Sequence, residues 1–468
     1  MNKKTKTQTD LRGGMHELLL RHPKSLDWGL PGYLHAPKGD IRNWQENAER
    51  HDCSAIAVLE ALKAAYELSS QFEKEVRVDE TVASLAQYAE LVLQHNKLRE
   101  NPWNVLIAGV EIPAVLSAVS PAHKDVRKLM KSAGELLGKS AVDLFDEEGV
   151  IVARHFPWYA AILATWTRCL RALSRRQINL KLKKSFFATF EWAVRQLLRC
   201  SNGNRGISDL AGNTIKLPKA FITSLLDLGG DISDKRLASK LGYPQTEYSK
   251  PVADHYLPDA TLHSNDSQVT VMRTGWGAKR REVYIRYHQQ EVFLEIASAG
   301  VVLFSGDIGS QLIVDGVPLV SSGSWQEVCW ESDDDVDYLE LEITCAGGWK
   351  VQKHILLAKD DNLVLIGNAV LGAGTRNDIS LQQPLPCGEG IRFFASEEHH
   401  EGFVWGENPA GMVLPLALPE WKTATSNGRL RSDDGIVHYE LSAREVTGMY
   451  APLLLVLDRK AGLRKYTW

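Results

Sequence analysis

The feature of this sequence that most constrains its fold is a change of hydrophobic period about halfway along the chain. From about residue 50 to 228, apolar residues recur every three or four positions, as in "VASLAQYAELV" (82–92), which is the period of a helix with one buried face. From about residue 257 onward the period is two. In "YLELEIT" (338–344), leucine and isoleucine alternate with polar residues, as in a β-strand. The chain is therefore expected to form a helical part and then a β part.

The helical half is expected to consist of antiparallel helical hairpins, because the connections between its periodic segments are short. The β half contains hairpin signals at Asp315-Gly316 and around Asp360-Asp361-Asn362, which favours a large antiparallel β-sandwich. The expected helices are 53–70, 79–97, 103–119, 123–145, 157–175, 183–200 and 217–227. The expected domains are an irregular tail (1–45), a helical domain (46–228), a linker (229–256) and a β-sandwich (257–468).

Composition narrows the class of protein. The chain has 468 residues, 44% hydrophobic and 24% charged, with a net charge of -4, which is typical of a globular protein with room for two domains. No nucleic-acid partner is expected, because the net charge is small and the sequence has no stripe of basic residues. We see no run of 18 apolar residues, so no membrane partner is expected. The basic, polar start lacks the apolar stretch of a secretion signal, which predicts a cytoplasmic protein.

Tryptophan is abundant, with 13 residues. Four of them, Trp276, Trp330, Trp349 and Trp405, lie in polar or glycine-bearing segments. An exposed indole ring can stack on a sugar, whereas a half-buried one is part of a core. Both alternatives stay open from the sequence.

Two segments of the helical half and three of the β half resemble one known family. The helical segments are "NPWNVLIAGVEIPAVLS" (101–117) and "DEEGVIVARHFPWYAAILATW" (146–166). The β segments are "VTVMRTGWG" (269–277), "YIRYHQQEVFLEIASAG" (284–300) and the strand–turn–strand run 337–370. In order and in local pattern they resemble the heparinase II/III-like polysaccharide lyases. The resemblance implies an α + β multidomain fold, with an incomplete (α/α) toroid of helical hairpins followed by an antiparallel β-sandwich.

The resemblance also implies an activity, the cleavage of uronate-containing polysaccharides by β-elimination. Such an enzyme must stabilise charge on the uronate carboxylate, remove the C5 proton and protonate the leaving oxygen. Tyr159 matches the family's proton-transferring tyrosine and Asn104 matches a carboxylate-binding asparagine. His288 lies one residue from the position of the family's sandwich-side histidine.

Three further residues are implied in substrate binding. Arg273 matches an arginine of the first β segment and would add positive charge near the site. Trp103 and Trp158 adjoin Asn104 and Tyr159 in the sequence and would offer ring faces to a sugar. The implied partner is an acidic polysaccharide or oligosaccharide. The sequence does not indicate an oligomeric state.

Three positions depart from the family pattern. Where family members have histidine, this chain has Val105, Ala160 and Gln289. None of these side chains transfers protons at neutral pH. His288 could replace Gln289 only if a bulge or loop lies there, because neighbouring strand residues face opposite ways. Two functions therefore stay open: a lyase with altered or lost catalysis, and a non-catalytic glycan- or protein-binding protein on the lyase scaffold.

Each candidate residue also has a structural interpretation. Tyr159 lies on an apolar helical stripe and could be a core residue, and Asn104 could cap a helix. Arg273 could belong to a salt bridge, and His288 could be a surface residue. The acidic turn 331–337 could hold Ca²⁺, but it lacks the glycine and distal glutamate of an EF-hand, which favours a solvated turn. The segment 397–401, with two histidines and three glutamates, could bind a metal, but a charged loop is favoured. No metal and no cofactor are therefore expected.

Overall fold

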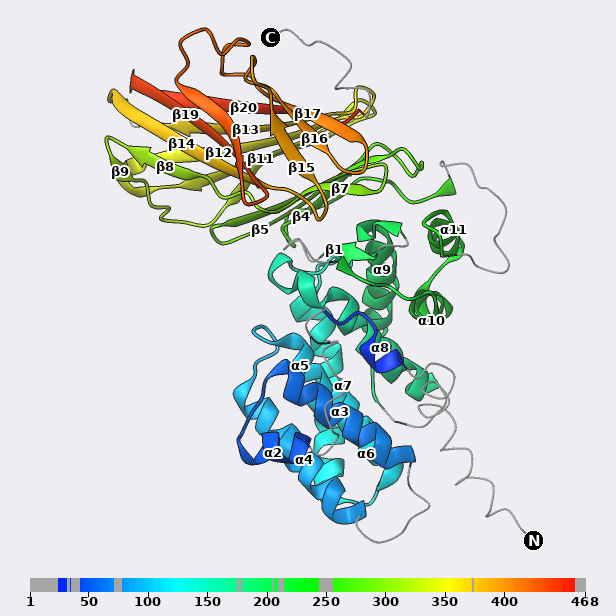
Figure 1. Ribbon diagram of the computed structural model, residues 1–468. Helices are drawn as coiled ribbons and strands as arrows, with labels where there is room; N and C mark the ends of the chain where they lie inside the picture. The colour runs from blue at the N-terminus through cyan, green and yellow to red at the C-terminus, as the bar shows by residue number, and fades with distance from the viewer. Residues whose placement is uncertain are drawn as a thin grey trace, which may run out of the picture. The chain divides into compact units, whose positions relative to one another are not determined.

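The computed structural model divides the chain into two compact units (Figure 1). The first unit comprises Met1–Asp209 and Asn213–Pro258, and the second comprises Leu210–Gly212 and Asp259–Trp468. The structure describes residues 24–31, 34, 43–70, 78–174, 178, 180–203, 206–208, 214–243, 256–372 and 374–458.

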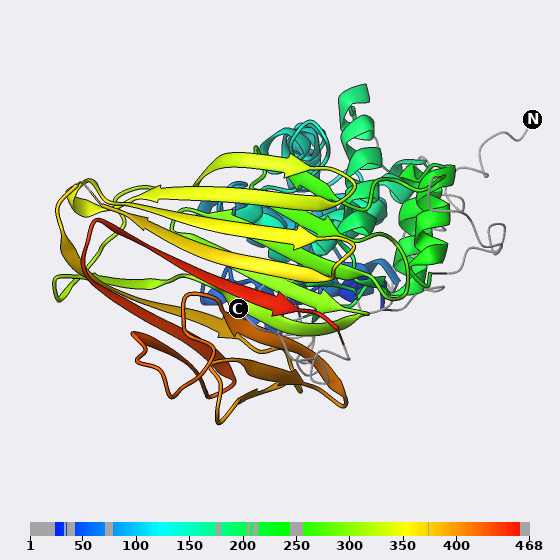
Figure 2. The ribbon, with the colours of Figure 1, turned by 90° about the horizontal axis from the view of Figure 1, so that it is seen from above.

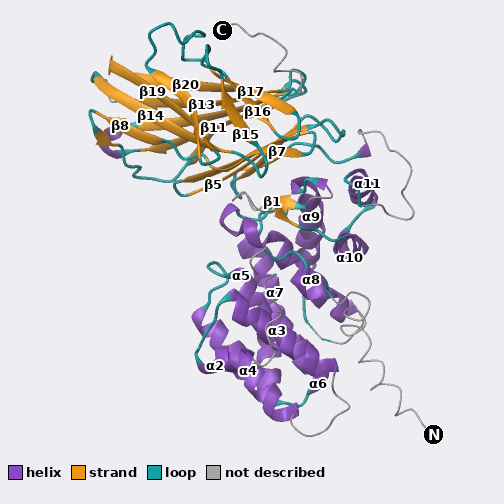
Figure 3. Cartoon of the chain, in the orientation of Figure 1, coloured by secondary structure: helices purple, strands orange, loops and turns teal. Residues whose placement is uncertain are grey.

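The first unit is helical, as the purple elements of Figure 3 show. Its helices are η1 (Ser25–Asp27), α2 (Asn43–Glu49), α3 (Ala55–Ser70), α4 (Val78–His95), α5 (Pro102–Leu106), η3 (Ile107–Glu111), α6 (Ile112–Val119), α7 (Lys124–Leu144), η4 (Ala153–Trp158), α8 (Tyr159–Ser174), α9 (Lys184–Cys200), α10 (Lys219–Gly229) and α11 (Ile232–Lys240). Strands β1 (Ile207–Ser208) and β2 (Thr214–Ile215) form a small antiparallel pair.

All seven predicted helical segments are helical in the structure. The segment predicted at 103–119 is continuous but not uniform, because the π-helical turn η3 separates α5 from α6. Pro102–Val119 is long and apolar enough to span a membrane, but 89% of it is buried inside the structure. Length and composition alone are weak evidence for a span, and burial of this degree is typical of a core helix.

The segment predicted as a linker, 229–256, contains a helix. Helix α11 begins at a capping box: the Asp231 side chain accepts hydrogen bonds from the Ser233 and Asp234 amides, and the Asp234 carboxylate accepts from the Asp231 amide. These bonds satisfy amide groups that a helix start otherwise leaves unpaired. The helix is polar and short, so hydrophobic periodicity did not reveal it.

Part of the predicted N-terminal tail packs into the helical unit. Trp28 and Leu30 are buried, and the Trp28 ring lies 5.5 Å from that of Phe221. Gly29 adopts a φ of +70°, and a Cβ built on it would come within 2.4 Å of the Ala160 carbonyl carbon. Only glycine can adopt this backbone so close to α8 without strain. The start of α8 is therefore covered by the chain's own N-terminal segment.

The second unit is built from antiparallel strands. They are β3 (Leu262–Ser264), β4 (Val269–Arg273), β5 (Arg281–His288), β6 (Glu291–Ser298), β7 (Val301–Asp307), β8 (Gln311–Val314), β9 (Val317–Pro318), β10 (Gln326–Ser332), β11 (Val336–Thr344), β12 (Lys350–Ala358), β13 (Leu363–Leu371), β14 (Asn377–Pro386), β15 (Arg392–Ala395), β16 (Gly402–Trp405), β17 (Pro409–Pro415), β18 (Gly428–Asp433), β19 (Ile436–Val446) and β20 (Gly448–Val456).

These strands form three sheets, and Figure 2 shows their long strands side by side. The eight-stranded sheet has the order β10-β11-β12-β13-β20-β17-β16-β15, and the five-stranded sheets have the orders β18-β19-β14-β8-β9 and β3-β4-β5-β6-β7. One continuous hydrophobic core takes residues from all three sheets, which is the packing of a β-sandwich. The predicted fold class, helices first and antiparallel sheets afterwards, is confirmed.

The predicted alternation and hairpins are present. In β11, Leu339, Leu341 and Ile343 are buried in the core while their neighbours are more exposed. The β8–β9 hairpin turns at Asp315 and Gly316, with φ values of 49° and 79°. Two successive positive φ angles define the turn type that matches the twist of paired strands, and Asp-Gly favours it.

Candidate functional site

Tyr159 begins α8 and is fully buried. Its hydroxyl donates to the Ala193 carbonyl at 2.8 Å, and the Gly149 carbonyl lies 3.4 Å away. The rings of Phe145 and Phe156 meet it edge-on. Burial raises the pKa of this phenol well above its usual value, because the charged phenolate would lose its hydration. The geometry favours the core alternative for Tyr159 over proton transfer to a substrate.

Asn104 is also buried, in the first turn of α5. The helix cap is Asn101, whose side chain accepts from the Asn104 amide at 3.4 Å, so the capping role belongs to the neighbouring asparagine. The Asn104 Nδ2 group donates to the Cys53 carbonyl at 2.8 Å. Its Oδ1 has no hydrogen-bond partner in the described part of the chain. That oxygen is an acceptor, so it cannot bind a substrate carboxylate.

Trp103 and Trp158 are brought together. Their rings stack with centroids 5.4 Å apart and planes at 8°. Trp103 is fully buried, whereas Trp158 at the end of η4 is half-buried. Arg154, exposed on the same short helix, donates through Nε to His155 Nε2 at 2.9 Å. We call Arg154, Pro157 and Trp158 the tryptophan shelf: a half-buried indole ring and an exposed cation on the same short 3-10 helix.

Arg273 lies on β4 and is buried in a polar network. Its guanidinium donates to the Glu282 carboxylate at 2.8 Å, to the Tyr284 hydroxyl at 2.8 Å and to the Ala260 carbonyl at 3.2 Å. It also lies 4.5 Å from the centroid of the Trp276 ring. Since the charge is paired inside the fold, the geometry favours the salt-bridge alternative for Arg273.

His288 ends β5 and is half-buried, with Nδ1 3.4 Å from Gln268 Oε1. Gln289, directly after it, has a φ of 52° and is exposed in the β5–β6 turn. The turn at Gln289 is the kind of irregularity that His288 would need in order to take the place of the family's histidine. His288 and Arg273 occupy opposite ends of the β4–β5 ladder, because Arg273 pairs with Glu282. Six residues of strand, about 20 Å, separate the two positions, so they do not form one cluster.

The sheet formed by β3 to β7 carries a buried polar face that the sequence did not predict. Glu282, Tyr284, Arg286 and His288 alternate along β5 with core residues. The Arg286 guanidinium lies 4.2 Å from the Phe293 ring centroid, and Ser305 donates to Glu295 at 3.1 Å on the neighbouring strands. The alternation "REVYIRYH" (281–288) signals a polar face. Periodicity could not show that this face is buried.

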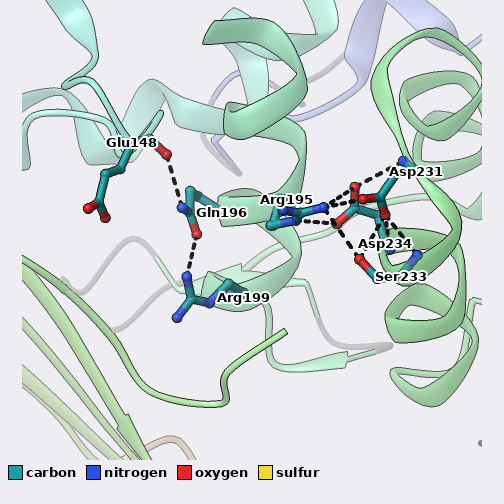
Figure 4. A network of polar contacts seen from close by, with 7 residues as sticks. All are labelled: Glu148, Arg195, Gln196, Arg199, Asp231, Ser233 and Asp234. Carbon is teal, nitrogen blue, oxygen red and sulfur yellow. Dashed lines mark hydrogen bonds and ion pairs between the residues drawn. The ribbon is translucent and has the colours of Figure 1, made fainter. Parts of the chain in front are cut away.

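The helical unit also has a pocket of about 440 Å³ between α9, α10 and α11. Figure 4 shows its central contact, in which Arg195 meets Asp231 at 2.5 Å and Asp234 at 2.8 Å. Burial opposes ionisation of Asp231, but hydrogen bonds from Asp234 and Ser233 and the Arg195 charge lower its pKa to about 2. Its charged lining residues are Glu191, Arg195, Asp227, Asp231, Asp234 and Lys235. With four acids against two bases, this pocket does not favour a polyanion.

Metal-ligating side chains do not gather within the described ranges: no three His, Cys, Asp or Glu residues there could hold one ion. Among the residues predicted from the family resemblance and their neighbours, those that remain partly accessible are the tryptophan shelf in the helical unit and the half-buried imidazole of His288 in the β unit. These groups can stack on a sugar ring, pair with an anion and move a proton at one position.

Comparisons with known proteins identify the scaffold. No family model and no curated protein matches the sequence. A helical unit followed by antiparallel sheets is the architecture of several solved polysaccharide lyase structures, and this chain shares that fold. More particularly, the chain has the fold of heparinase III.

Three solved structures carry this assignment. A heparinase III gene product superposes with a TM-score of 0.64 at 12% identity, covering 96% of this chain and 75% of that one. Heparan sulfate lyase HepC from Pedobacter heparinus gives 0.60 at 12% identity, covering 98% and 78%. A further heparinase III gives 0.62 at 10% identity, covering 89% and 73%. At such low identity the match establishes the fold and leaves the chemistry to the residues present.

Proposed function

We propose that this protein binds an acidic, uronate-containing polysaccharide on a heparinase III scaffold, and that the lyase chemistry of the scaffold is altered or lost. The observation that carries the loss of lyase chemistry is the burial of Tyr159. Its hydroxyl donates a hydrogen bond to a main-chain carbonyl inside the fold. The similar structures include a heparan sulfate lyase, which supports an acidic polysaccharide as the ligand. The tryptophan shelf supplies a ring and a cation suited to it.

The loss of catalysis follows from what β-elimination requires. A base must take the C5 proton while donors stabilise the charge that develops on the carboxylate. The three positions that have histidine in the family hold Val105, Ala160 and Gln289, which cannot act as bases. The side-chain amide of Asn104 already donates a hydrogen bond to the Cys53 carbonyl. Groups of an active site act as a unit, so a single loss removes orders of magnitude of rate.

One observation favours a second candidate, a lyase with a rebuilt site. His288 is half-buried at a turn, and histidine is the side chain that most often serves as a general base. In that case the base would be His288, and Tyr159 would have only a structural role. The two candidate functions differ in the rate at which the protein cleaves a uronate-containing polysaccharide by β-elimination.

The first prediction is that the protein does not form unsaturated uronides. Incubation of the wild type with heparan sulfate, alginate, hyaluronan or pectate should give no rise in ultraviolet absorbance above that of the polysaccharide without protein, and Tyr159→Phe should behave in the same way. A rise in the wild type that Tyr159→Phe abolishes would contradict the proposal and establish the original proton-transfer role. A rise that survives Tyr159→Phe and disappears in His288→Gln would establish the rebuilt lyase.

The second prediction concerns the tryptophan shelf. Trp158→Ala should raise the Kd for a heparan sulfate oligosaccharide about tenfold, because a stacked indole contributes on the order of 1.4 kcal/mol to binding. Isothermal titration calorimetry measures this change. The matched control is Trp192→Ala, which removes an indole of similar kind that is 44% exposed elsewhere in the helical unit. Equal Kd values for the two variants would remove the shelf from the proposed binding site.

A further inference from the structure

The β15–β16 hairpin, at one edge of the eight-stranded sheet, carries a group of rings and a cation on one face. Arg392 pairs directly with Trp405, and Phe394 pairs directly with Phe403. Directly paired residues lie on the same face, as do residues two apart on one strand. All four side chains therefore point the same way, and together they line a pocket of about 290 Å³. We call these four residues the hairpin patch.

The patch faces solvent, whereas its sequence neighbours face the core. Phe393 and Val404 belong to the hydrophobic core of the sandwich. Phe394 is 47% exposed and Trp405 is 38% exposed. Among the tryptophans in polar or glycine-bearing segments, Trp276 and Trp349 are buried and Trp330 packs partly buried against the core. For Trp405 the sugar-stacking alternative remains.

Arg392 supplies the chemical preference. Its guanidinium makes no hydrogen bond and no ion pair with any described residue, and it lies 5.7 Å from the centroid of the Phe394 ring. By contrast, Arg429 and Arg431 on nearby β18 are both bound to Glu440. A guanidinium that retains its donors, held against an aromatic ring, is suited to bidentate recognition of a carboxylate or sulfate group.

We propose that the hairpin patch is an accessory binding site for an acidic sugar residue of a polysaccharide, within the β unit. The apolar face of the sugar ring stacks on Trp405 and Phe394, while its carboxylate or sulfate pairs with Arg392. The pocket is at the small end of the range for ligand sites, so it holds a short stretch of the chain. The identity of the ligand rests on the proposed function, but the location of the site does not.

Two other occupants fit the observations less well. A neutral glycan would use the rings but leave the guanidinium of Arg392 without a partner. A second protein molecule needs about 800 Å² of contact on each side for a stable interface, and four side chains on a short edge hairpin offer far less. The combination of two exposed rings and one available cation selects an acidic sugar.

The test is calorimetric titration of the full chain with a heparan sulfate hexasaccharide. Trp405→Ala and Arg392→Gln should each raise the Kd of one site about tenfold, and Arg392→Lys should recover part of the loss. Trp192→Ala, with an indole of similar exposure in the helical unit, should bind as the wild type does. Cellohexaose, which carries no charge, should bind at least tenfold more weakly than the acidic hexasaccharide.

The outcomes separate this inference from the proposed function. If Trp158→Ala has no effect and Trp405→Ala weakens binding, the hairpin patch stands and the tryptophan shelf fails. If Trp158→Ala weakens binding and Trp405→Ala has no effect, and the circular dichroism of both variants is unchanged, the accessory site is overturned. Equal affinity for cellohexaose would overturn the role of Arg392. A dimer in sedimentation analysis that Trp405→Ala converts to a monomer would show that the patch is a self-association surface, and would overturn the proposal.

Discussion

Replacing Arg168 by methionine is expected to lower the free energy of unfolding of the helical unit by about 3–5 kcal/mol, because it leaves a buried charge without its partner. Arg168 and Glu111 are both buried, and they are joined by two hydrogen bonds, at 2.5 Å from Nε and 2.9 Å from Nη2. The Tyr66 hydroxyl donates to the same carboxylate at 2.8 Å. Urea unfolding followed by far-ultraviolet circular dichroism measures the loss.

The double variant Glu111→Met with Arg168→Met is the informative control. Replacing a whole buried ion pair by apolar residues of similar size is often neutral or stabilising. The double variant should therefore be considerably more stable than Arg168→Met alone. A loss below about 1 kcal/mol for Arg168→Met, or a double variant less stable than the single one, would show that the pair does not hold this region together.

The same arginine ties the N-terminal segment to the helical unit. Arg168 Nη1 donates to the Ser25 carbonyl at 2.8 Å. Gly29, four residues after Ser25, lies against Ala160 of α8. Loss of the guanidinium should therefore also raise amide hydrogen exchange in residues 25–30. This link has a structural consequence for the candidate site, because the segment that Arg168 holds covers the start of α8.

The helices and strands of this chain were largely predictable because their hydrophobic periods are strong. Helix α7 and strand β11 both show alternation of buried and exposed residues at their own period. Helix α11 was missed because it is polar, although its capping box "DISD" (231–234) is a readable start signal. The π-helical turn η3 gave no periodic signal, because one extra residue per turn does not interrupt an apolar run.

The candidate site was less predictable, because sequence indicates residue types and not exposure. Tyr159 and Asn104 lie in apolar segments, and both side chains are engaged by main-chain carbonyls inside the fold. A readable signal was overlooked in the same segments. Glu111 and Arg168 are charged residues within otherwise apolar stretches, and charges are seldom buried unless they are paired. Two such residues in one helical domain predict a buried ion pair.

The second large effect concerns Lys353 in the sandwich core. Its ammonium is fully buried on β12, where it donates to the Ile308 carbonyl at 3.0 Å and to Asn368 Oδ1 at 2.8 Å. Asn368 in turn donates to Gln383 on β14, which belongs to another sheet. Burial lowers the pKa of Lys353 from 10.5 to about 7, and the Asp307 charge offsets this only in part.

The stability of the β unit should consequently rise with pH between about 7 and 10.5. In that window the unfolded chain binds one more proton than the folded chain, so the free energy of unfolding increases by about 1.4 kcal/mol per pH unit. Below pH 7 the amine is charged in both states and the desolvation penalty is present in full. Above pH 10.5 it is neutral in both states and the penalty is gone. From pH 7 to 9 we expect a gain of roughly 2–3 kcal/mol.

Lys353→Met should remove this slope, while Lys350→Met, which removes an exposed lysine of the same strand, should keep it. At pH 7 the urea midpoint of unfolding should change little in Lys353→Met, because two effects offset each other. The methionine avoids the cost of burying a charge, but it leaves the Ile308 carbonyl without its hydrogen-bond donor. Urea titrations from pH 7 to 9, followed by hydrogen exchange of β12 and β13, separate the β unit from the helical unit. Cysteine thiols also ionise near this range, and the Lys350→Met control contains the same thiols. A slope that persists in Lys353→Met would assign the pH dependence to another group and show that this amine is charged in the folded core.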